Sequence, residues 1–255
     1  MLREMSGRIR SLVPARARRF ARELESALRD AKRRTAAQGA RPLPDRYFIK
    51  AGYRHRESPR YDEQTEIGAN WQASVYEEAV RLAEELDLKR IVDVGCGDGR
   101  KLATLHSRFA VVGLDYGPNL ELCRARYACG TWIEHDLEQK GTLPLDGALL
   151  RDAVVVCADV IEHLVRPEIL LGKLAAALES APLLLLSTPD RDLVRGPAHL
   201  GPPPNESHVR EWSLDEFASL LVASGLRDGT VRHIRSNDVS PERHTILATL
   251  WGRRN

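Results

Sequence analysis

The stretch Val92-Asp93-Val94-Gly95-Cys96-Gly97-Asp98-Gly99 decides the fold of this chain. The apolar segment 90–94 predicts a short buried strand, and the glycines after it predict a tight turn into a helix. Glycines at such a turn let the backbone approach a ligand and direct helix N–H groups toward it. Asp115 follows 20 residues after Gly95, at the end of the next apolar segment. A carboxylate there can bind both ribose hydroxyls, so the pattern indicates a cofactor that contains adenosine.

The glycine spacing narrows the choice of cofactor. Dinucleotide-binding proteins use G-x-G-x-x-G, whereas this loop reads G-x-G-x-G. Asp93 and Asp98 would repel a pyrophosphate, and they suit a cationic ligand. The loop therefore favours S-adenosylmethionine, which has a sulfonium and an ammonium group and no phosphate.

Strands and helices alternate along the rest of the chain. The patterns predict strands at 90–94, 110–114, 131–134, 153–158, 182–187, 230–234 and 246–251. Helices are expected over 70–87, from about residue 99, from Pro118, over 167–179 and over 213–224, where Ser213 and Glu216 form a capping box. Such alternation predicts an α/β fold with a doubly wound, mostly parallel sheet.

Several ordered motifs resemble the class I S-adenosylmethionine-dependent methyltransferases, in particular their small-molecule O-methyltransferase branch. The resemblance covers roughly residues 70–255. It rests on segments 93–99, 113–116, 136–138, 159–164 and 186–191. It implies a Rossmann-like, doubly wound seven-stranded sheet whose last strand is antiparallel, with S-adenosylmethionine as cofactor and S-adenosylhomocysteine as product.

The resemblance also implies roles for the cofactor-binding residues. Asp93 and the loop residues Gly95, Cys96, Gly97 and Gly99 would hold the methionine end. Asp115 would bind the ribose with Tyr116 beside it, while Asp136 would bind the adenine amine and Leu137 would pack on the ring. For Asp136 the alternative is a turn or helix cap. We interpret the side chains of Cys96 and Cys157 as small residues in tight places.

A second group of polar residues follows the strand at 153–158. Asp159, Glu162 and His163 have the spacing i, i+3, i+4, which puts them on one side of a helical turn at the carboxyl edge of the sheet. His163 is the first candidate general base, with Glu162 orienting it or binding the acceptor. His208, after a proline-rich segment, is the second. Alternatively, these residues only cap the helix and fix the loops.

Two carboxylates and two histidines can also bind Mn²⁺, Fe²⁺ or Zn²⁺. The set Asp159, Glu162, His163 and His208 is similar to the metal site of small-RNA 3′-terminal 2′-O-methyltransferases. This chain has Asp159 where that family has Glu, and we expect no RNA-binding domains. A divalent metal therefore stays open, and no metal ligand is assigned.

Residues 1–46 form a basic arm with 13 Lys and Arg against 5 Asp and Glu, although the whole chain carries only +2. Residues 15–35 predict an amphipathic helix. It could dock on RNA, an anionic membrane or a protein; we favour packing on the domain or on a second subunit, as in a homodimer. The remaining residues, 47–255, form the predicted methyltransferase domain. Their acidic balance makes nucleic acid an unlikely partner.

The expected reaction is methyl transfer to an oxygen of a small-molecule, sugar or natural-product acceptor. Segment 159–162 lacks the [ND]-P-P-aromatic motif of nucleobase and glutamine methyltransferases. N-methylation of a small molecule, metal-assisted RNA 2′-O-methylation and a non-catalytic binding scaffold remain alternatives. With no apolar run of membrane-spanning length, no signal peptide and no CxxC pair, we expect a cytoplasmic protein.

Overall fold

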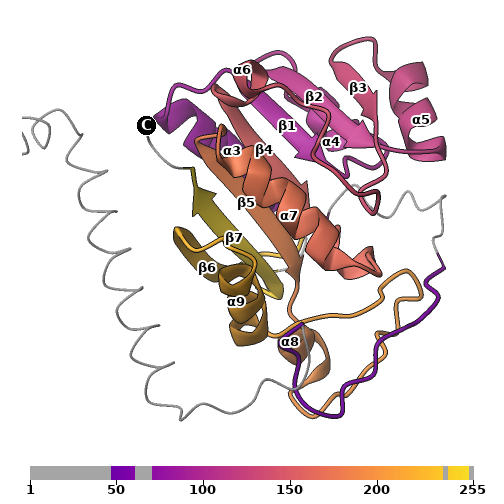
Figure 1. The fold of residues 1–255 in the computed structure, drawn as a ribbon. Helices are drawn as coiled ribbons and strands as arrows, with labels where there is room; N and C mark the ends of the chain where they lie inside the picture. Colours follow the sequence, from indigo (N-terminus) through magenta and orange to yellow (C-terminus); the bar gives the residue numbers. More distant parts are fainter. Residues whose placement is uncertain (1–46, 61–70, 238–240, 253–255) are drawn as a thin grey trace, which may run out of the picture. The chain divides into compact units, whose positions relative to one another are not determined.

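A mixed seven-stranded β-sheet organises the part of the chain that the computed structural model describes, residues 47–60, 71–237 and 241–252 (Figure 1). The predicted basic arm lies outside these residues. The strand order is β3-β2-β1-β4-β5-β7-β6. The strands are β1 (Arg90–Val94), β2 (Ala110–Asp115), β3 (Thr131–Glu134), β4 (Ala153–Ala158), β5 (Leu183–Pro189), β6 (Gly229–Ile234) and β7 (Thr245–Trp251).

The strand directions confirm the predicted fold class. Strands β1 to β5 pair in parallel, while β7 lies between β5 and β6 and is antiparallel to both. Chain order reverses between β1 and β4, so the carboxyl ends of these two strands flank the crevice where ligands bind in such sheets. The glycine loop follows β1, and the predicted chemical residues follow β4.

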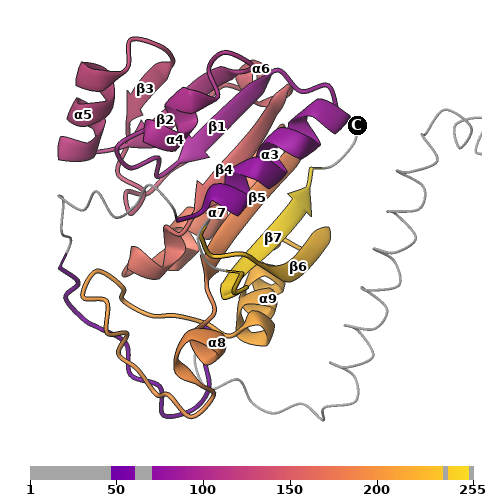
Figure 2. The same ribbon diagram turned by 180° about the vertical axis from the view of Figure 1, so that it is seen from behind.

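Helices cover both faces of the sheet, as a doubly wound fold requires (Figures 1 and 2). One face packs on α7 (Pro167–Leu178) and α9 (Leu214–Ala223), and the other packs on α3 (Ala73–Glu85) and α4 (Arg100–Thr104). In β4, Val154 and Val156 belong to one core, and Val155 and Cys157 belong to the other. The continuous apolar run of β4 follows from this two-sided burial.

The other helices of the described residues are short. They are α5 (Pro118–Arg126), α6 (Gly147–Leu150), the 3₁₀ turn η2 (Ile161–His163) and α8 (Arg191–Arg195). Pro118 opens α5 and the Ser213–Glu216 capping box opens α9, both as predicted. The sequence patterns did not predict α8, which begins because the Asp190 side chain accepts from the backbone N–H groups of Asp192 and Leu193. None of the described helices is long and apolar enough to cross a bilayer.

The segment 47–60 runs beside the long loop that joins α8 to α9 (Figures 1 and 2). Backbone N–H groups of Arg54, Arg56 and Arg60 donate to carbonyls of that loop at 2.8, 2.7 and 2.9 Å. At the end of the segment nearest β5, the Trp212 indole N–H donates to the Tyr47 carbonyl at 3.0 Å. These hydrogen bonds hold the loop that carries His208 against segment 47–60.

Candidate active site

The glycine loop between β1 and α4 has the backbone that its sequence predicted. Gly95, Gly97 and Gly99 have φ of 81°, 57° and 71°, a region that other residues seldom adopt. The Gly97 N–H donates to Oδ2 of Asp115 at 2.8 Å, and the Tyr116 N–H donates to Oδ1 at 2.8 Å. The loop and the predicted ribose-binding carboxylate therefore form one unit at the carboxyl ends of β1 and β2.

Asp93 lies under this loop and is almost completely buried. Its Oδ2 accepts a hydrogen bond from the Tyr76 hydroxyl at 2.5 Å, whereas Oδ1 has no hydrogen-bond partner within the described protein. Burial raises the pKa of Asp93 to about 7. A buried oxygen with an unused acceptor site suits a cationic ligand. Sequence reasoning missed Tyr76, although its place on the predicted helix 70–87 could have indicated it.

Cys96 and Cys157 both occupy tight places. A Cβ added at Gly113 would come within 2.8 Å of Cys96 Sγ. Cys157, a residue of β4, is fully buried in the core. Neither thiol has a geometry that assigns it a chemical role.

The predicted adenine-binding residues lie at the end of β3. Asp136 is exposed, and its Oδ1 accepts from the Glu138 N–H at 2.8 Å, so it makes a side-chain turn. Leu137 is buried in the core beside the sheet, and Tyr116 is 53% exposed. The roles of Asp136, Leu137 and Tyr116 toward adenine and ribose stay predictions.

Asp159 does not share a helical turn with Glu162 and His163, as the spacing had suggested. Its backbone is left-handed, with φ 52°, and it lies outside η2, which begins at Ile161. Its Oδ1 accepts from the Ser187 hydroxyl at 2.6 Å. Burial raises the pKa of Asp159, although the Ser187 hydrogen bond opposes the rise. Asp159 therefore ties β4 to β5.

Glu162 is fully buried behind the same edge. Its Oε2 accepts from the Thr188 hydroxyl at 3.0 Å, while Oε1 has no hydrogen-bond partner within the described protein. Burial, followed by the charge of Asp159, raises the pKa of Glu162 well above its ordinary value. The Glu162 carbonyl accepts from the Val209 N–H at 2.8 Å, which joins η2 to the His208 loop.

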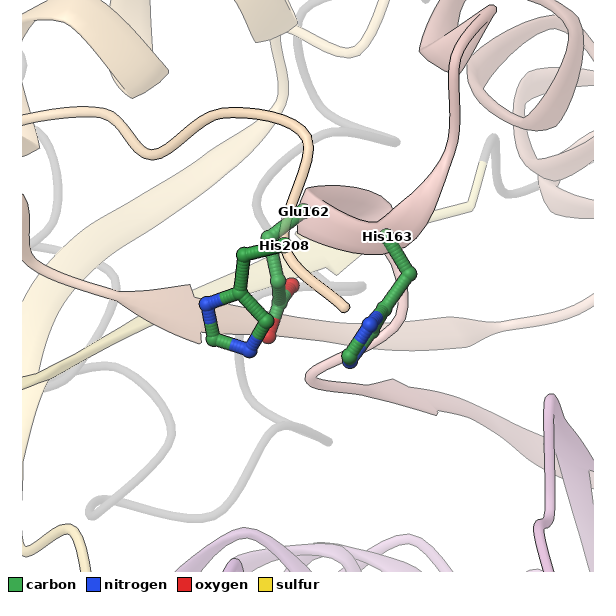
Figure 3. A group of neighbouring side chains, drawn as sticks. All are labelled: Glu162, His163 and His208. Carbon is green, nitrogen blue, oxygen red and sulfur yellow. The ribbon is translucent and has the colours of Figure 1, made fainter. Parts of the chain in front are cut away.

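The two histidine rings meet at this junction (Figure 3). Their centroids are 4.7 Å apart and their planes cross at 88°. His163 Nδ1 lies 3.0 Å from the Ser207 carbonyl, to which it donates. Burial, followed by the proximity of His208, lowers the pKa of His163 to about 4. His163 is therefore a weak base near neutral pH.

His208 has different polar partners. Its Nδ1 lies 2.5 Å from Oε1 of Glu211, and its Nε2 lies 3.0 Å from the Asn205 side-chain amide. Glu211 is fully buried and forms two hydrogen bonds with Arg195, at 2.6 and 2.8 Å. Burial alone would raise the pKa of Glu211, but His208 and Arg195 lower it below its ordinary value. Neither Asn205 nor Glu211 was singled out from the sequence.

Three of these side chains could hold a metal ion. Ligand atoms of Glu162, His163 and His208 lie within 4.8 Å of one another. One carboxylate and two imidazoles suit Mn²⁺, Fe²⁺ or Zn²⁺, and the unused Glu162 Oε1 is a further point of fit. Asp159, the fourth residue of the predicted set, lies outside this group.

The comparisons with known proteins agree with this architecture. Residues 20–230 match the family described as "Methyltransferase domain". A probable S-adenosylmethionine-dependent methyltransferase of Mycobacterium tuberculosis (strain H37Rv) is 32% identical over 151 residues, or 58% of this chain. The match covers 52% of that relative, so the chain spans about half the length of the curated proteins it matches.

Two solved structures share the fold. The methyltransferase domain of a bacterial Hen1, CtHen1-CN, superposes with a TM-score of 0.51 at 18% identity, over 71% of this chain and 100% of that one. The N-terminal domain of EvdMO1, solved with S-adenosylhomocysteine, gives 0.51 at 20% identity, over 90% and 97%. The family match confirms the predicted superfamily, and these structures show its fold: the chain belongs to the methyltransferase-domain family and has the fold of the class I S-adenosylmethionine-dependent methyltransferases.

Proposed function

We propose that this protein transfers a methyl group from S-adenosylmethionine to a hydroxyl oxygen of a small-molecule acceptor, such as a sugar or a natural-product intermediate. The observation that carries the proposal is the pair of histidine rings at the carboxyl end of β4, the strand that pairs with β1 before the glycine loop. A Cβ added at Gly95 would meet Val160 Cγ2 at 2.6 Å, so the loop touches the segment that leads into η2. A methyl donor on the loop would thus have two imidazoles nearby.

Cofactor binding, proton removal and exclusion of water are assigned to different residues of the site. Asp93 and the loop backbone would bind the methionine end, and Asp115 would bind the ribose. Bound S-adenosylmethionine would supply an electrophilic methyl group on sulfur, open to in-line attack by the acceptor oxygen with S-adenosylhomocysteine as the leaving group. An imidazole nitrogen takes the hydroxyl proton, which makes the oxygen a better nucleophile. The buried surroundings of Glu162 and Thr188 would exclude water from the reacting groups.

His208 suits the role of base better than His163, the first candidate from sequence. A pKa of about 4 makes His163 a weak proton acceptor near neutral pH. His208, by contrast, has its Nδ1 on the ionised carboxylate of Glu211, an arrangement that orients the ring and stabilises the proton once taken. We therefore assign proton removal to His208, and ring packing and loop attachment to His163.

Alanine variants of the two histidines test this assignment. Methyl transfer from labelled S-adenosylmethionine is measured against a panel of sugars, phenols and amines, and S-adenosylhomocysteine release is followed. His208→Ala is expected to lower turnover about 10²- to 10⁴-fold without weakening cofactor binding. The control is His106→Ala, an exposed histidine away from the site. Turnover by His208→Ala near the wild-type rate would overturn the assignment. Transfer confined to amines would overturn the hydroxyl acceptor.

A metal-assisted reaction is the second candidate, favoured by the cluster of Glu162, His163 and His208 and by the unused Oε1. In that case the three side chains would hold an ion that binds acceptor hydroxyls. The test is a thermal-shift titration of chelator-treated protein with Mn²⁺ or Zn²⁺. A saturable shift that Glu162→Gln abolishes supports the metal; no shift excludes it. The homodimer and the cytoplasmic location stay predictions.

A further inference from the structure

We propose that Glu211 and Asn205 are positioning residues that fix His208 in one tautomer, with the proton on Nδ1 and the lone pair on Nε2. The inference rests on the proposed function, because it says how the same ring is prepared to take a proton from the acceptor. It assigns roles to two residues that have none in the methyltransferase motifs of the sequence.

The contact with Glu211 determines that Nδ1 of His208 carries the proton. Arg195 donates to both carboxylate oxygens of Glu211, through Nη2 at 2.6 Å and Nε at 2.8 Å. This two-point contact keeps the carboxylate ionised and fixes its orientation. An ionised carboxylate only accepts hydrogen bonds, so the nitrogen 2.5 Å from Oε1 must carry the proton. That nitrogen is Nδ1 of His208.

The contacts of Asn205 independently indicate the same tautomer, with the lone pair on Nε2. The backbone N–H and the hydroxyl of Ser207 both lie on Oδ1 of Asn205, at 3.0 and 2.7 Å. A backbone N–H can only donate, so the atom it meets must be the amide oxygen, and the orientation of the amide follows. The NH₂ group therefore points to His208 Nε2, 3.0 Å away. Because NH₂ is a donor, Nε2 must offer its lone pair.

The surrounding contacts hold this arrangement in place. Arg56 donates through Nε to the His208 carbonyl at 3.3 Å and through Nη2 to the Pro203 carbonyl at 2.6 Å. The Glu211 N–H donates to the Tyr53 hydroxyl at 3.1 Å. Glu211 is fully buried, but Asn205 is exposed. The amide of Asn205 can thus turn into solvent when an acceptor hydroxyl takes its place on Nε2.

Two isosteric variants test the proposal from opposite ends. Glu211→Gln replaces one acceptor oxygen by a donor, so the side chain can no longer satisfy both Arg195 and the Nδ1 proton. Asn205→Asp keeps an oxygen for Ser207 and places a second oxygen opposite Nε2, which favours a proton there. Glu206→Gln is the matched control: its carboxylate is exposed in the same loop and pairs with Arg60 at 3.7 Å.

The first readout is the ¹⁵N spectrum of the His208 ring in the full chain, which needs no acceptor. Wild type and Glu206→Gln are expected to show a protonated Nδ1 and an unprotonated Nε2, whereas both test variants gain a proton on Nε2. A wild-type ring with its proton on Nε2, or an unchanged tautomer in both variants, would overturn the inference. A merely structural role would leave the tautomer unchanged.

The second readout is kinetic. We expect Glu211→Gln to lower kcat by about 10²-fold or more, by analogy with loss of the carboxylate that orients a catalytic histidine, with KM for S-adenosylmethionine nearly unchanged. His208→Ala separates the two claims. If His208→Ala is fully active, the proposed role of His208 as the base fails; if it is inactive while Glu211→Gln and Asn205→Asp are fully active, only the positioning inference fails.

Discussion

The imidazoles of His163 and His208 meet edge to face, with ring centroids 4.7 Å apart, yet their polar partners differ. His163 donates to the Ser207 carbonyl, whereas His208 contacts the carboxylate of Glu211. A carbonyl bond orients a ring, and a carboxylate also stabilises its positive charge. The difference in partners is why two adjacent histidines suit two tasks.

The low pKa of His163 predicts a loss of stability in acid. The ordinary pKa of histidine is 6.5 and the pKa of His163 in the folded state is about 4. Between these two pH values the unfolded chain binds a proton at His163 and the folded chain does not. Stability is fully present above pH 6.5 and is lost as the pH falls toward 4, by about 2 kcal/mol between pH 7 and pH 5. His163→Asn, whose amide can still donate to Ser207, should reduce this loss in urea unfolding. An equal loss in His163→Asn and wild type would contradict the prediction.

Asp93 predicts that cofactor binding strengthens as the pH rises, while its own contribution to the stability of the free protein falls. Burial raises its pKa to about 7, and a cationic ligand binds the ionised form. The affinity for S-adenosylhomocysteine should therefore rise by up to about tenfold per unit as the pH increases toward 7, and level off above it. Free-protein stability should fall over the same range, because the folded state keeps a proton that the unfolded state releases. Calorimetric titrations of wild type and Asp93→Asn from pH 5.5 to 8 test this: the Asn variant should lose the slope.

Removal of the Asp115 carboxylate should weaken cofactor binding. Asp115 accepts from the Gly97 and Tyr116 N–H groups and would also bind the ribose hydroxyls. Asp115→Ala is expected to cost about 1–3 kcal/mol of S-adenosylhomocysteine binding, measured by calorimetry. Glu85→Ala serves as the control, since this carboxylate is exposed on α3 and contacts Arg81. Unchanged affinity in Asp115→Ala would exclude the ribose assignment.

Two glycines of the loop predict a graded loss of stability. Gly97 has φ 57° with open space around it, so Gly97→Ala should cost only the left-handed backbone, about 1–2 kcal/mol. At Gly95 the added methyl also meets Val160 Cγ2 at 2.6 Å, which should cost a further 1–3 kcal/mol or so. Val160→Ala in the Gly95→Ala background should recover part of that loss in denaturant unfolding. Equal losses of unfolding free energy in Gly95→Ala and Gly97→Ala would show that Val160 moves aside without measurable strain.

The elements that the sequence predicted are those with a local signal. Ala153–Ala158 is apolar without interruption because both faces of β4 are covered, and Pro118 opens α5 at a position that suits its fixed φ. The glycine loop and Asp115 were also predictable, because backbone chemistry limits which residues can occupy such a turn. The antiparallel β7 came from the family resemblance and is confirmed by its pairing with β5 and β6.

The parts that escaped prediction depend on contacts between distant segments. Tyr76 reaches Asp93 from a helix that precedes β1, and Ser187 turns the Asp159 side chain toward β5. The spacing of Asp159, Glu162 and His163 suggested one helical turn, but the left-handed backbone at Asp159 breaks that regularity. The link from Glu211 to His208 needs Arg195 beside it, and no short motif records that pairing.

A ligand titration of the full chain tests whether the glycine loop binds S-adenosylmethionine. Unfolding temperature is followed with S-adenosylmethionine, S-adenosylhomocysteine and NAD, on wild type and Asp115→Ala. The two sulfur nucleosides, at about 100 times their dissociation constant, should add about 2.7 kcal/mol of apparent stability to wild type and much less to Asp115→Ala. NAD should add none. If NAD alone stabilises the wild type, or if neither sulfur nucleoside does, the glycine loop is not an S-adenosylmethionine site.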